Sequence, residues 1–78
     1  MKLSELAVGE SAFVVKLCCH GVIRRRMCDL GICTGVRIEC IGASPLADPR
    51  AYLVRGKSVA LRNVEARGIL VHPASSRH

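Results

Sequence analysis

Apolar residues recur at every second position in short stretches of this chain, and a period of two is that of a β-strand with one buried face. The first stretch runs from Ser11 to Leu17. Its larger side chains are predicted to face the core: Phe13, Val15 and Leu17. The positions between them are predicted to face the other way: Ala12, Val14 and Lys16. A second stretch, Val36 to Ile41, predicts a strand that buries Val36, Ile38 and Cys40.

A different period separates these two strands. Between Val22 and Leu30, apolar residues stand at i, i+4 and i+7, which predicts a short amphipathic helix. Its inner stripe consists of Ile23, Met27 and Leu30. Three consecutive arginines project away from that stripe: Arg24, Arg25 and Arg26. Gly31 supplies the stop of the helix, and Gly35 marks the turn into the second strand.

The segments Ala51–Arg55 and Ser58–Arg62 predict a β-hairpin joined by the two-residue loop Gly56-Lys57. A glycine at the first loop position suits a type II′ turn. This loop sets the expected cross-strand pairs: Arg55 with Ser58, Val54 with Val59, and Tyr52 with Leu61. The large apolar pairs then fall on one face of the hairpin.

After the hairpin, Asn63–Arg67 predicts one helical turn, and Ile69 to Val71 a last short strand ended by Pro73. The pattern therefore predicts a mainly β fold, a small five-stranded barrel with one short amphipathic helix, because closure hides the strand edges. We expect one domain over residues 1–73 and a disordered tail at 74–78. A chain of 78 residues is too short to divide its core in two.

Composition limits the cellular location and the kinds of partner that we expect for this protein. No apolar run approaches the roughly 18 to 20 residues of a membrane span, and no continuous apolar segment near the N-terminus predicts an export signal. The five cysteines are odd in number, so we expect reduced thiols and a cytoplasmic protein. The formal charge of +6 favours an acidic partner, whether nucleic acid, a membrane surface or an acidic protein face.

Three blocks of sequence, in order, resemble those of one known family. Residues 26–35 (RMCDLGICTG) are similar to the "RL-x-(D/E)-LG-(I/L)-xxG" signature of the ferrous iron transport protein A (FeoA) family. Residues 44–49 (SPLADP) resemble its "aPlgDP" turn, and residues 59–62 (VALR) its "(L/I)-ALR" strand. Met27 and Ala47 depart from the usual Leu and Gly, and the Cys18-Cys19-His20 stretch matches no family motif.

The resemblance implies an SH3-like barrel that occurs alone or as a module of iron-dependent repressors and ferrous iron transporters. It implies a free-standing accessory of ferrous iron uptake that contacts the cytoplasmic part of the FeoB transporter. Two alternatives stay open: a small basic nucleic-acid-binding barrel, and a stand-alone regulatory module of a metal-dependent repressor. The two aromatic residues, Phe13 and Tyr52, make a poor platform for stacking bases, although a binder of the phosphate backbone would not need them.

We expect no catalytic residues, no metal site and no cofactor, and hence no enzyme. A nucleophile, a base and a group that orients the base are not recognisable around the histidines, which are His20, His72 and His78. Zinc sites usually repeat a CxxC-like pair, and the spacing of Cys18, Cys19, Cys28 and Cys33 does not follow that pattern. Cys40 is predicted to be a core residue.

The residues predicted to bind the partner lie on two faces. Arg24 and Arg25 project from the helix, with Arg55 and Lys57 of the hairpin as expected neighbours. Guanidinium groups on such a face suit paired carboxylates of an acidic partner. Val14 and Leu53 are predicted to lie on the strand face opposite the core, where an apolar patch rimmed by arginine would also suit an interface.

Overall fold

Five antiparallel strands form one sheet in the order β4-β3-β2-β1-β5 in the computed structural model, which describes residues 1–43 and 48–74. The strands are β1 (Ser11–Leu17), β2 (Arg37–Ala43), β3 (Arg50–Val54), β4 (Lys57–Leu61) and β5 (Ile69–Pro73). The helical elements are a 3-10 turn, η1 (Leu3–Glu5), and the helices α1 (Gly21–Asp29) and α2 (Asn63–Ala66). The predicted mainly β fold with five strands and a short helix is confirmed.

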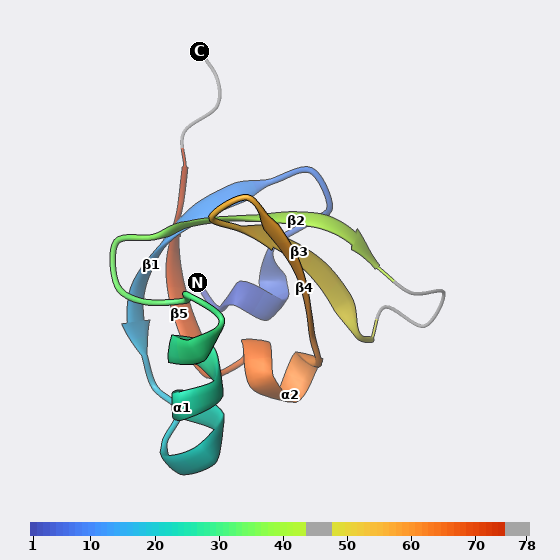
Figure 1. The fold of residues 1–78 in the computed structure, drawn as a ribbon. Helices are drawn as coiled ribbons and strands as arrows, with labels where there is room; N and C mark the ends of the chain where they lie inside the picture. Colours follow the sequence, from blue (N-terminus) through green and yellow to red (C-terminus); the bar gives the residue numbers. More distant parts are fainter. Residues whose placement is uncertain (44–47, 75–78) are drawn as a thin grey trace.

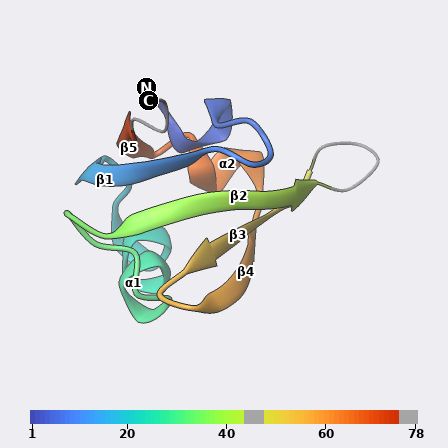
Figure 2. The same cartoon turned by 90° about the horizontal axis from the view of Figure 1, so that it is seen from above.

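The sheet curls around its own core. Figures 1 and 2 show η1 and α2 on the concave side of the sheet, while α1 lies beyond one end of it. The core residues are nearly all aliphatic and come from the inner faces of the strands and from the helical elements: Leu3, Leu6, Ala12, Val14, Leu17, Met27, Ile32, Ile38, Cys40, Tyr52, Val54, Leu61, Ala66, Ile69 and Val71. Cys40 is thus a core residue, as predicted.

β1 begins and ends at the predicted residues, but the prediction of its inner face was wrong. Phe13 is 43% exposed and Val15 52%, whereas Val14 is buried. The register against β5 shifts between Val14 and Lys16, so Val15 is the extra residue of a β-bulge. The bulge restores Leu17 to the inner face, because it moves the alternation by one position. The prediction assumed an uninterrupted strand, in which Phe13 and Val15 lie on the same face as Leu17.

The hairpin of β3 and β4 forms, with a register that differs from the predicted one. Its loop is Arg55-Gly56, at φ +52° and +82°, and positive φ at both central positions is that of a type I′ turn. Tyr52 therefore lies opposite Val59, and not opposite Leu61. The partner has moved by two residues, so Tyr52 still faces the core. The prediction failed because arginine rarely adopts the positive φ that this turn requires.

The remaining elements follow the predicted bounds closely. α1 begins one residue before the predicted start, and Met27 is fully buried. Leu30 packs against the core, whereas Ile23 is 39% exposed, so the inner stripe of the helix is narrower than predicted. Gly31, at φ +88°, ends the helix. β2 is also bulged, with a register shift around Ile41.

Two predicted features fall partly outside the described residues. Positions 44–47 of the motif at 44–49 are not described, and neither are residues 75–78 of the expected tail. Ala74 is described, and its backbone N–H donates a hydrogen bond to the carbonyl oxygen of Ser11 at 2.9 Å. This hydrogen bond ties the backbone of Ala74 to the start of β1.

Arg50 fastens the N-terminal turn to the sheet, a contact that the sequence analysis missed. Its Nη1 atom donates hydrogen bonds to the carbonyl oxygens of Ser4 at 3.1 Å and Leu6 at 2.6 Å. Leu3 and Leu6 on this turn are buried, so the turn closes one side of the core. A charged donor to two carbonyls is worth more than a neutral hydrogen bond.

We expect Arg50→Leu to destabilise the fold through this turn. Losing a charged donor leaves two part-buried carbonyls without it, which should cost about 1 to 2 kcal/mol and lower Tm by roughly 5 to 10 °C in a domain of this size. Thermal unfolding and amide exchange at Glu5 and Leu6 measure the effect. The matched control is Arg67→Leu, because Arg67 is exposed and its side chain makes no hydrogen bond or ion pair among the described residues. Equal losses in both variants would contradict the role of Arg50.

Candidate functional site

The three arginines of α1 are exposed, as predicted, but only one is free of internal contacts. Arg24 Nη1 donates a hydrogen bond to the carbonyl oxygen of Leu17 at 3.0 Å, which ties the helix to the end of β1. Arg26 forms an ion pair with Glu65 of α2. Within the described residues, the side chain of Arg25 has no hydrogen bond or ion pair. Arg25 is therefore the arginine of this helix that is available to a partner.

The ion pair of Arg26 and Glu65 fixes α1 against α2. Partial burial acts to raise the pKa of Glu65, but hydrogen bonds from the Arg26 side chain and the backbone N–H of Arg62, with the positive charges of both residues, outweigh it and leave the pKa lowered. Glu65 is therefore held in its charged form. This contact orients the helix and sets the direction in which Arg25 projects.

The hairpin tip lies against the C-terminal end of α1. The Cδ atom of Arg55 lies 3.2 Å from the position that a Cβ would take at Gly31, so the stem of Arg55 covers the glycine that ends the helix. Arg25 precedes Gly31 by six residues, about 9 Å along a helix axis. The structure thus brings Arg55 to one end of α1, while Lys57 is exposed at the start of β4.

Of the two apolar residues that were predicted to bind the partner, only one lies at the surface. Leu53 is half-buried and lines a surface pocket. Val14 is only 2% exposed and belongs to the core, so its predicted place on the outer face was wrong. The cause is the bulge in β1, which places Phe13 and Val15 outside instead. These two side chains are the apolar surface that the sequence reasoning missed, and only a bulge signal in β1 could have revealed it.

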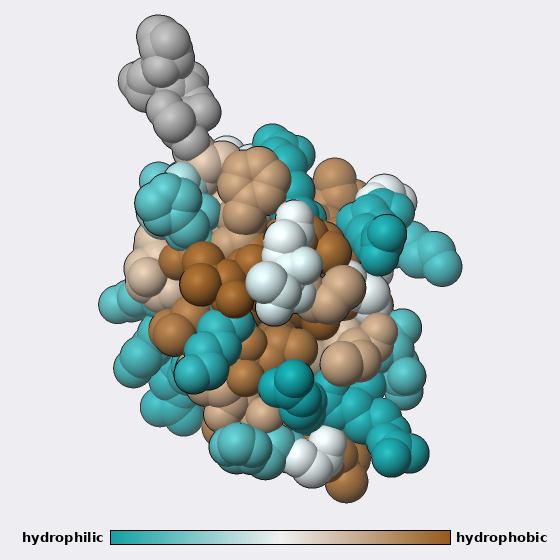
Figure 3. Space-filling model, turned by 90° about the vertical axis from the view of Figure 1, so that its left-hand side faces the viewer, coloured by the Kyte–Doolittle hydropathy of each residue, from teal (hydrophilic) through white to brown (hydrophobic). Residues whose placement is uncertain are grey.

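Figure 3 shows apolar side chains gathered on one face of the molecule, with hydrophilic ones around them. The large apolar residues that are exposed include Phe13 and Val15 of β1 and Val22 and Ile23 of α1. Val22, at 83%, is the most exposed of these. Exposed apolar side chains next to charged ones are common at protein interfaces.

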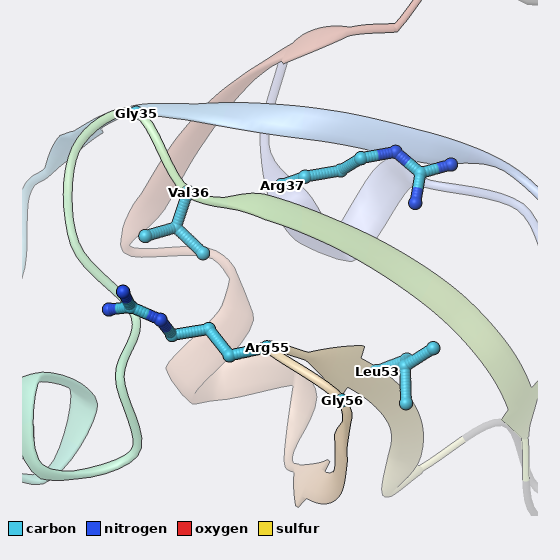
Figure 4. Close-up of a pocket in the computed structure, with 6 residues that line it drawn as sticks. All are labelled: Gly35, Val36, Arg37, Leu53, Arg55 and Gly56. Atoms are coloured by element: carbon cyan, nitrogen blue, oxygen red, sulfur yellow. The ribbon is translucent and has the colours of Figure 1, made fainter.

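A pocket of about 410 Å³ opens between the start of β2 and the tip of the β3–β4 hairpin. Its lining combines two glycines, two aliphatic residues and two arginines: Gly35, Gly56, Val36, Leu53, Arg37 and Arg55. In Figure 4, Val36 points toward the stem of Arg55, and the guanidinium of Arg37 points away along β2. Arg37 Nη2 donates a hydrogen bond to Ser11 Oγ at 2.8 Å.

The described residues do not bring together the groups of a metal or catalytic centre. Within residues 1–43 and 48–74, no three side chains of His, Cys, Asp or Glu form a group that could hold a metal ion. All five thiols are free, and Cys18, Cys28 and Cys33 are exposed. His20 and His72 are exposed on different elements. Asp48 accepts a hydrogen bond from the backbone N–H of Asn63 at 3.0 Å, at the start of α2.

None of the helices in the described part of the chain has the length and hydrophobicity that crossing a membrane requires.

The sequence of this chain matches one known protein family. The family model of the FeoA domain matches residues 1–73. A curated relative in Porphyromonas gingivalis, a "Fe(2+) transport protein A/Fe(2+) transporter FeoB fusion protein", is 37% identical over 97% of this chain. The chain spans only 9% of the length of that relative.

Solved structures agree with the family match. The solution structure of the FeoA protein from Chlorobium tepidum superposes with a TM-score of 0.91, at 36% identity, over 100% of this chain and 74% of that one. The crystal structure of Stenotrophomonas maltophilia FeoA superposes with a TM-score of 0.76, at 32% identity, over 91% of this chain and 88% of that one. That protein was crystallised in complex with zinc and is described as a prokaryotic SH3 domain protein. The SH3-like fold implied by the sequence resemblance is thus confirmed.

The first prediction from this geometry concerns pH. Because folding lowers the pKa of Glu65 from its ordinary value of 4.5, its contribution to stability is present above that value and is lost as pH falls through the folded pKa. An exposed pair of this kind contributes about 0 to 1 kcal/mol. We expect Glu65→Gln to lower Tm by a few degrees near neutral pH, and the difference from the parent to vanish in acid.

Melting curves between neutral pH and pH ~3 test this dependence on Glu65. Glu39→Gln is the matched control, because Glu39 has no ion pair among the described residues and should behave as the parent at every pH. A Tm difference for Glu65→Gln that persists unchanged into acid would mean that the ion pair is not its cause.

The second prediction concerns metal content. Since the described residues gather no metal-binding group, we expect the protein purified without chelator to carry far less than one metal ion per chain. Elemental analysis measures this directly. Stoichiometric zinc or iron that disappears in the double variant Cys18→Ser, Cys19→Ser would overturn the expectation and place a site at the end of β1.

Proposed function

The chain belongs to the FeoA family, and on that premise we propose that it is a non-catalytic accessory of ferrous iron uptake that docks onto the cytoplasmic part of a FeoB-type transporter. The observation that carries this proposal is the relative in Porphyromonas gingivalis, in which a FeoA-like segment and FeoB form one polypeptide. Two proteins that are fused in one organism commonly act on each other as separate chains in another. The transporting activity would belong to the partner.

The docking surface that we propose consists of the exposed arginines and lysine near the C-terminal end of α1: Arg25, Arg55 and Lys57, with Leu53 beside them. Arg25 and Arg55 have no ion pair among the described residues, so an acidic surface could take both. Arg24 stays a peripheral member, because its hydrogen bond to Leu17 already uses one donor. Val14 is excluded by its burial.

Two other roles are outcomes of the test. Phe13 is the only exposed aromatic side chain of the chain, since Tyr52 is buried, so base stacking would have a single ring. A protein that binds the nucleic-acid backbone through charge alone would have an affinity that falls as the salt concentration rises. It would not distinguish one acidic partner from another. A regulatory role with a metal-dependent repressor would appear as binding to the repressor in place of the transporter.

We expect Arg25→Glu to weaken binding to the transporter's cytoplasmic domain by at least about fivefold at low salt, and less at high salt, because a carboxylate would face an acidic surface. Folding should be little affected, since the exposed side chain of Arg25 makes no hydrogen bond or ion pair among the described residues. Arg67→Glu changes the net charge equally on α2 and serves as the control. Affinity by calorimetry or interferometry, at two salt concentrations, measures the effect.

Equal losses in Arg25→Glu and Arg67→Glu would assign binding to net charge, and tight binding of duplex DNA by the parent would favour the nucleic-acid role. If the parent does not bind the transporter domain at all, the proposed function is wrong.

A further inference from the structure

The pocket beside the hairpin tip joins an apolar floor to unbalanced positive charge. Val36 and Leu53 supply the aliphatic surface, and the lining contains two arginines and no carboxylate. Arg37 already donates a hydrogen bond to Ser11. The guanidinium of Arg55 has no hydrogen bond or ion pair among the described residues. A ligand that suits this pocket must therefore bring negative charge and an apolar group together.

The backbone at Arg55 is a second, independent observation. Arg55 is the only residue other than glycine with positive φ in the described part of the chain. Gly, Asn or Asp is strongly preferred at this position of a type I′ turn, because positive φ brings the Cβ atom of an L-residue close to a backbone carbonyl oxygen, and Asn and Asp offset this cost through local hydrogen bonds. A strained residue that persists at a pocket points to a use for its side chain.

The stem of Arg55 is also held in place. Its Cδ atom lies against Gly31, at the distance of 3.2 Å from a notional Cβ, so any larger residue at position 31 would displace it. No atom lies within 4 Å of the notional Cβ positions of Gly35 and Gly56, which leaves both sides of the pocket open. The guanidinium thus stands at the mouth of an accessible pocket on a stem of restricted freedom.

We propose that this pocket binds an acidic, aliphatic segment of a protein partner, in which a carboxylate pairs with Arg55 and a neighbouring aliphatic side chain contacts the aliphatic lining residues, Val36 and Leu53. The proposal rests on the proposed function, because it names the chemistry that the docking partner presents. A planar guanidinium donates two parallel hydrogen bonds to the two oxygens of a carboxylate. A volume of about 410 Å³ admits one or two side chains.

A free inorganic anion fits the observations less well, because it would make no use of Val36 and Leu53. Nucleic acid fits less well too, because no aromatic side chain lines the pocket for a base to stack on. The test below includes inorganic phosphate as the free anion.

The test titrates the full chain, labelled with ¹⁵N, and follows its amide resonances. The probe is a blocked hexapeptide with Glu-Leu-Asp at its centre, the neutral probe carries Gln-Leu-Asn instead, and the anion probe is inorganic phosphate. We expect the acidic peptide alone to shift the amides of Gly35, Val36 and Gly56, with saturation. Equal shifts at equal concentration with the neutral peptide or with phosphate would overturn the proposal.

Four variants separate charge, strain and apolar contact. Arg55→Gln keeps the stem and removes the charge, and should weaken binding of the acidic peptide about tenfold or more. Arg55→Asn suits the turn, and should lose binding equally while Tm stays within a few degrees of the parent or rises. Leu53→Thr keeps a residue suited to a strand and should weaken binding several-fold. The control, Arg67→Gln, should bind as the parent does.

The outcomes distinguish this proposal from the proposed function. If Arg55→Gln binds the acidic peptide as well as the parent, or if Arg55→Asn unfolds far below the parent, Arg55 is a structural residue and the pocket proposal is wrong. If the parent binds the transporter domain and Arg55→Gln binds it equally well, the pocket proposal fails while the proposed function stands. If the parent binds the peptide but not the transporter domain, the pocket stands and its partner is another protein.

Discussion

The bulges at Val15 in β1 and Ile41 in β2 bend the sheet enough for five short strands to enclose a core. The edge strands β4 and β5 are not hydrogen-bonded to each other, so the barrel is completed by other parts of the chain. Met1 and Val71 exchange backbone hydrogen bonds along the free edge of β5. Arg26 reaches the carbonyl oxygen of Ala60 at the free edge of β4. Curvature thus determines which segments must cover the edges and the concave side.

This arrangement divides the positive charge of the chain into two kinds. Arg24, Arg26 and Arg50 donate hydrogen bonds to backbone or side-chain acceptors of other elements, and hold α1 and η1 against the sheet. Arg25 and Arg55 make no such contact among the described residues. The formal charge of +6 therefore overstates the positive charge that is available to a partner, since several arginines hold elements of the fold together. The side chains of Arg25 on α1 and Arg55 at the hairpin tip remain exposed and unpaired among the described residues.

The approximate extent of the five strands and of α1 and α2 could be predicted because short-range patterns encode it, whereas η1 (Leu3–Glu5) was not predicted. β1 has its predicted bounds, and Ile38 and Cys40 face the core as the alternation in β2 indicated. The inner face of β1 could not be predicted. A bulge shifts the alternation of inward-facing and outward-facing residues by one position and leaves no mark in the amino-acid composition of the strand. The register of the hairpin failed for a similar reason, because Arg55 occupies a conformation that its residue type disfavours.

Contacts between residues that are far apart in the sequence could not be predicted from short-range patterns. Arg50 and its acceptors are separated by 44 and 46 residues, and Arg26 and Glu65 by 39. Each of these arginines looks like a solvated surface charge in sequence. The candidate site was found in part, because exposed arginines on a helix are visible in the pattern, whereas the pocket depends on how the hairpin tip meets β2.

The residues that carry the family resemblance are those that the fold requires. Met27 and Ile32 are buried, Arg26 pairs with Glu65, and Gly31 has a positive φ and accommodates the stem of Arg55. Such a signature identifies the barrel, because any member must end α1 and turn into β2 in the same way. Met27 and Ile32 point inward and Arg26 joins α1 to α2, so these residues identify the barrel and not a partner. Arg55 lies outside this signature and is, in the described part of the chain, the one residue other than glycine with a positive φ.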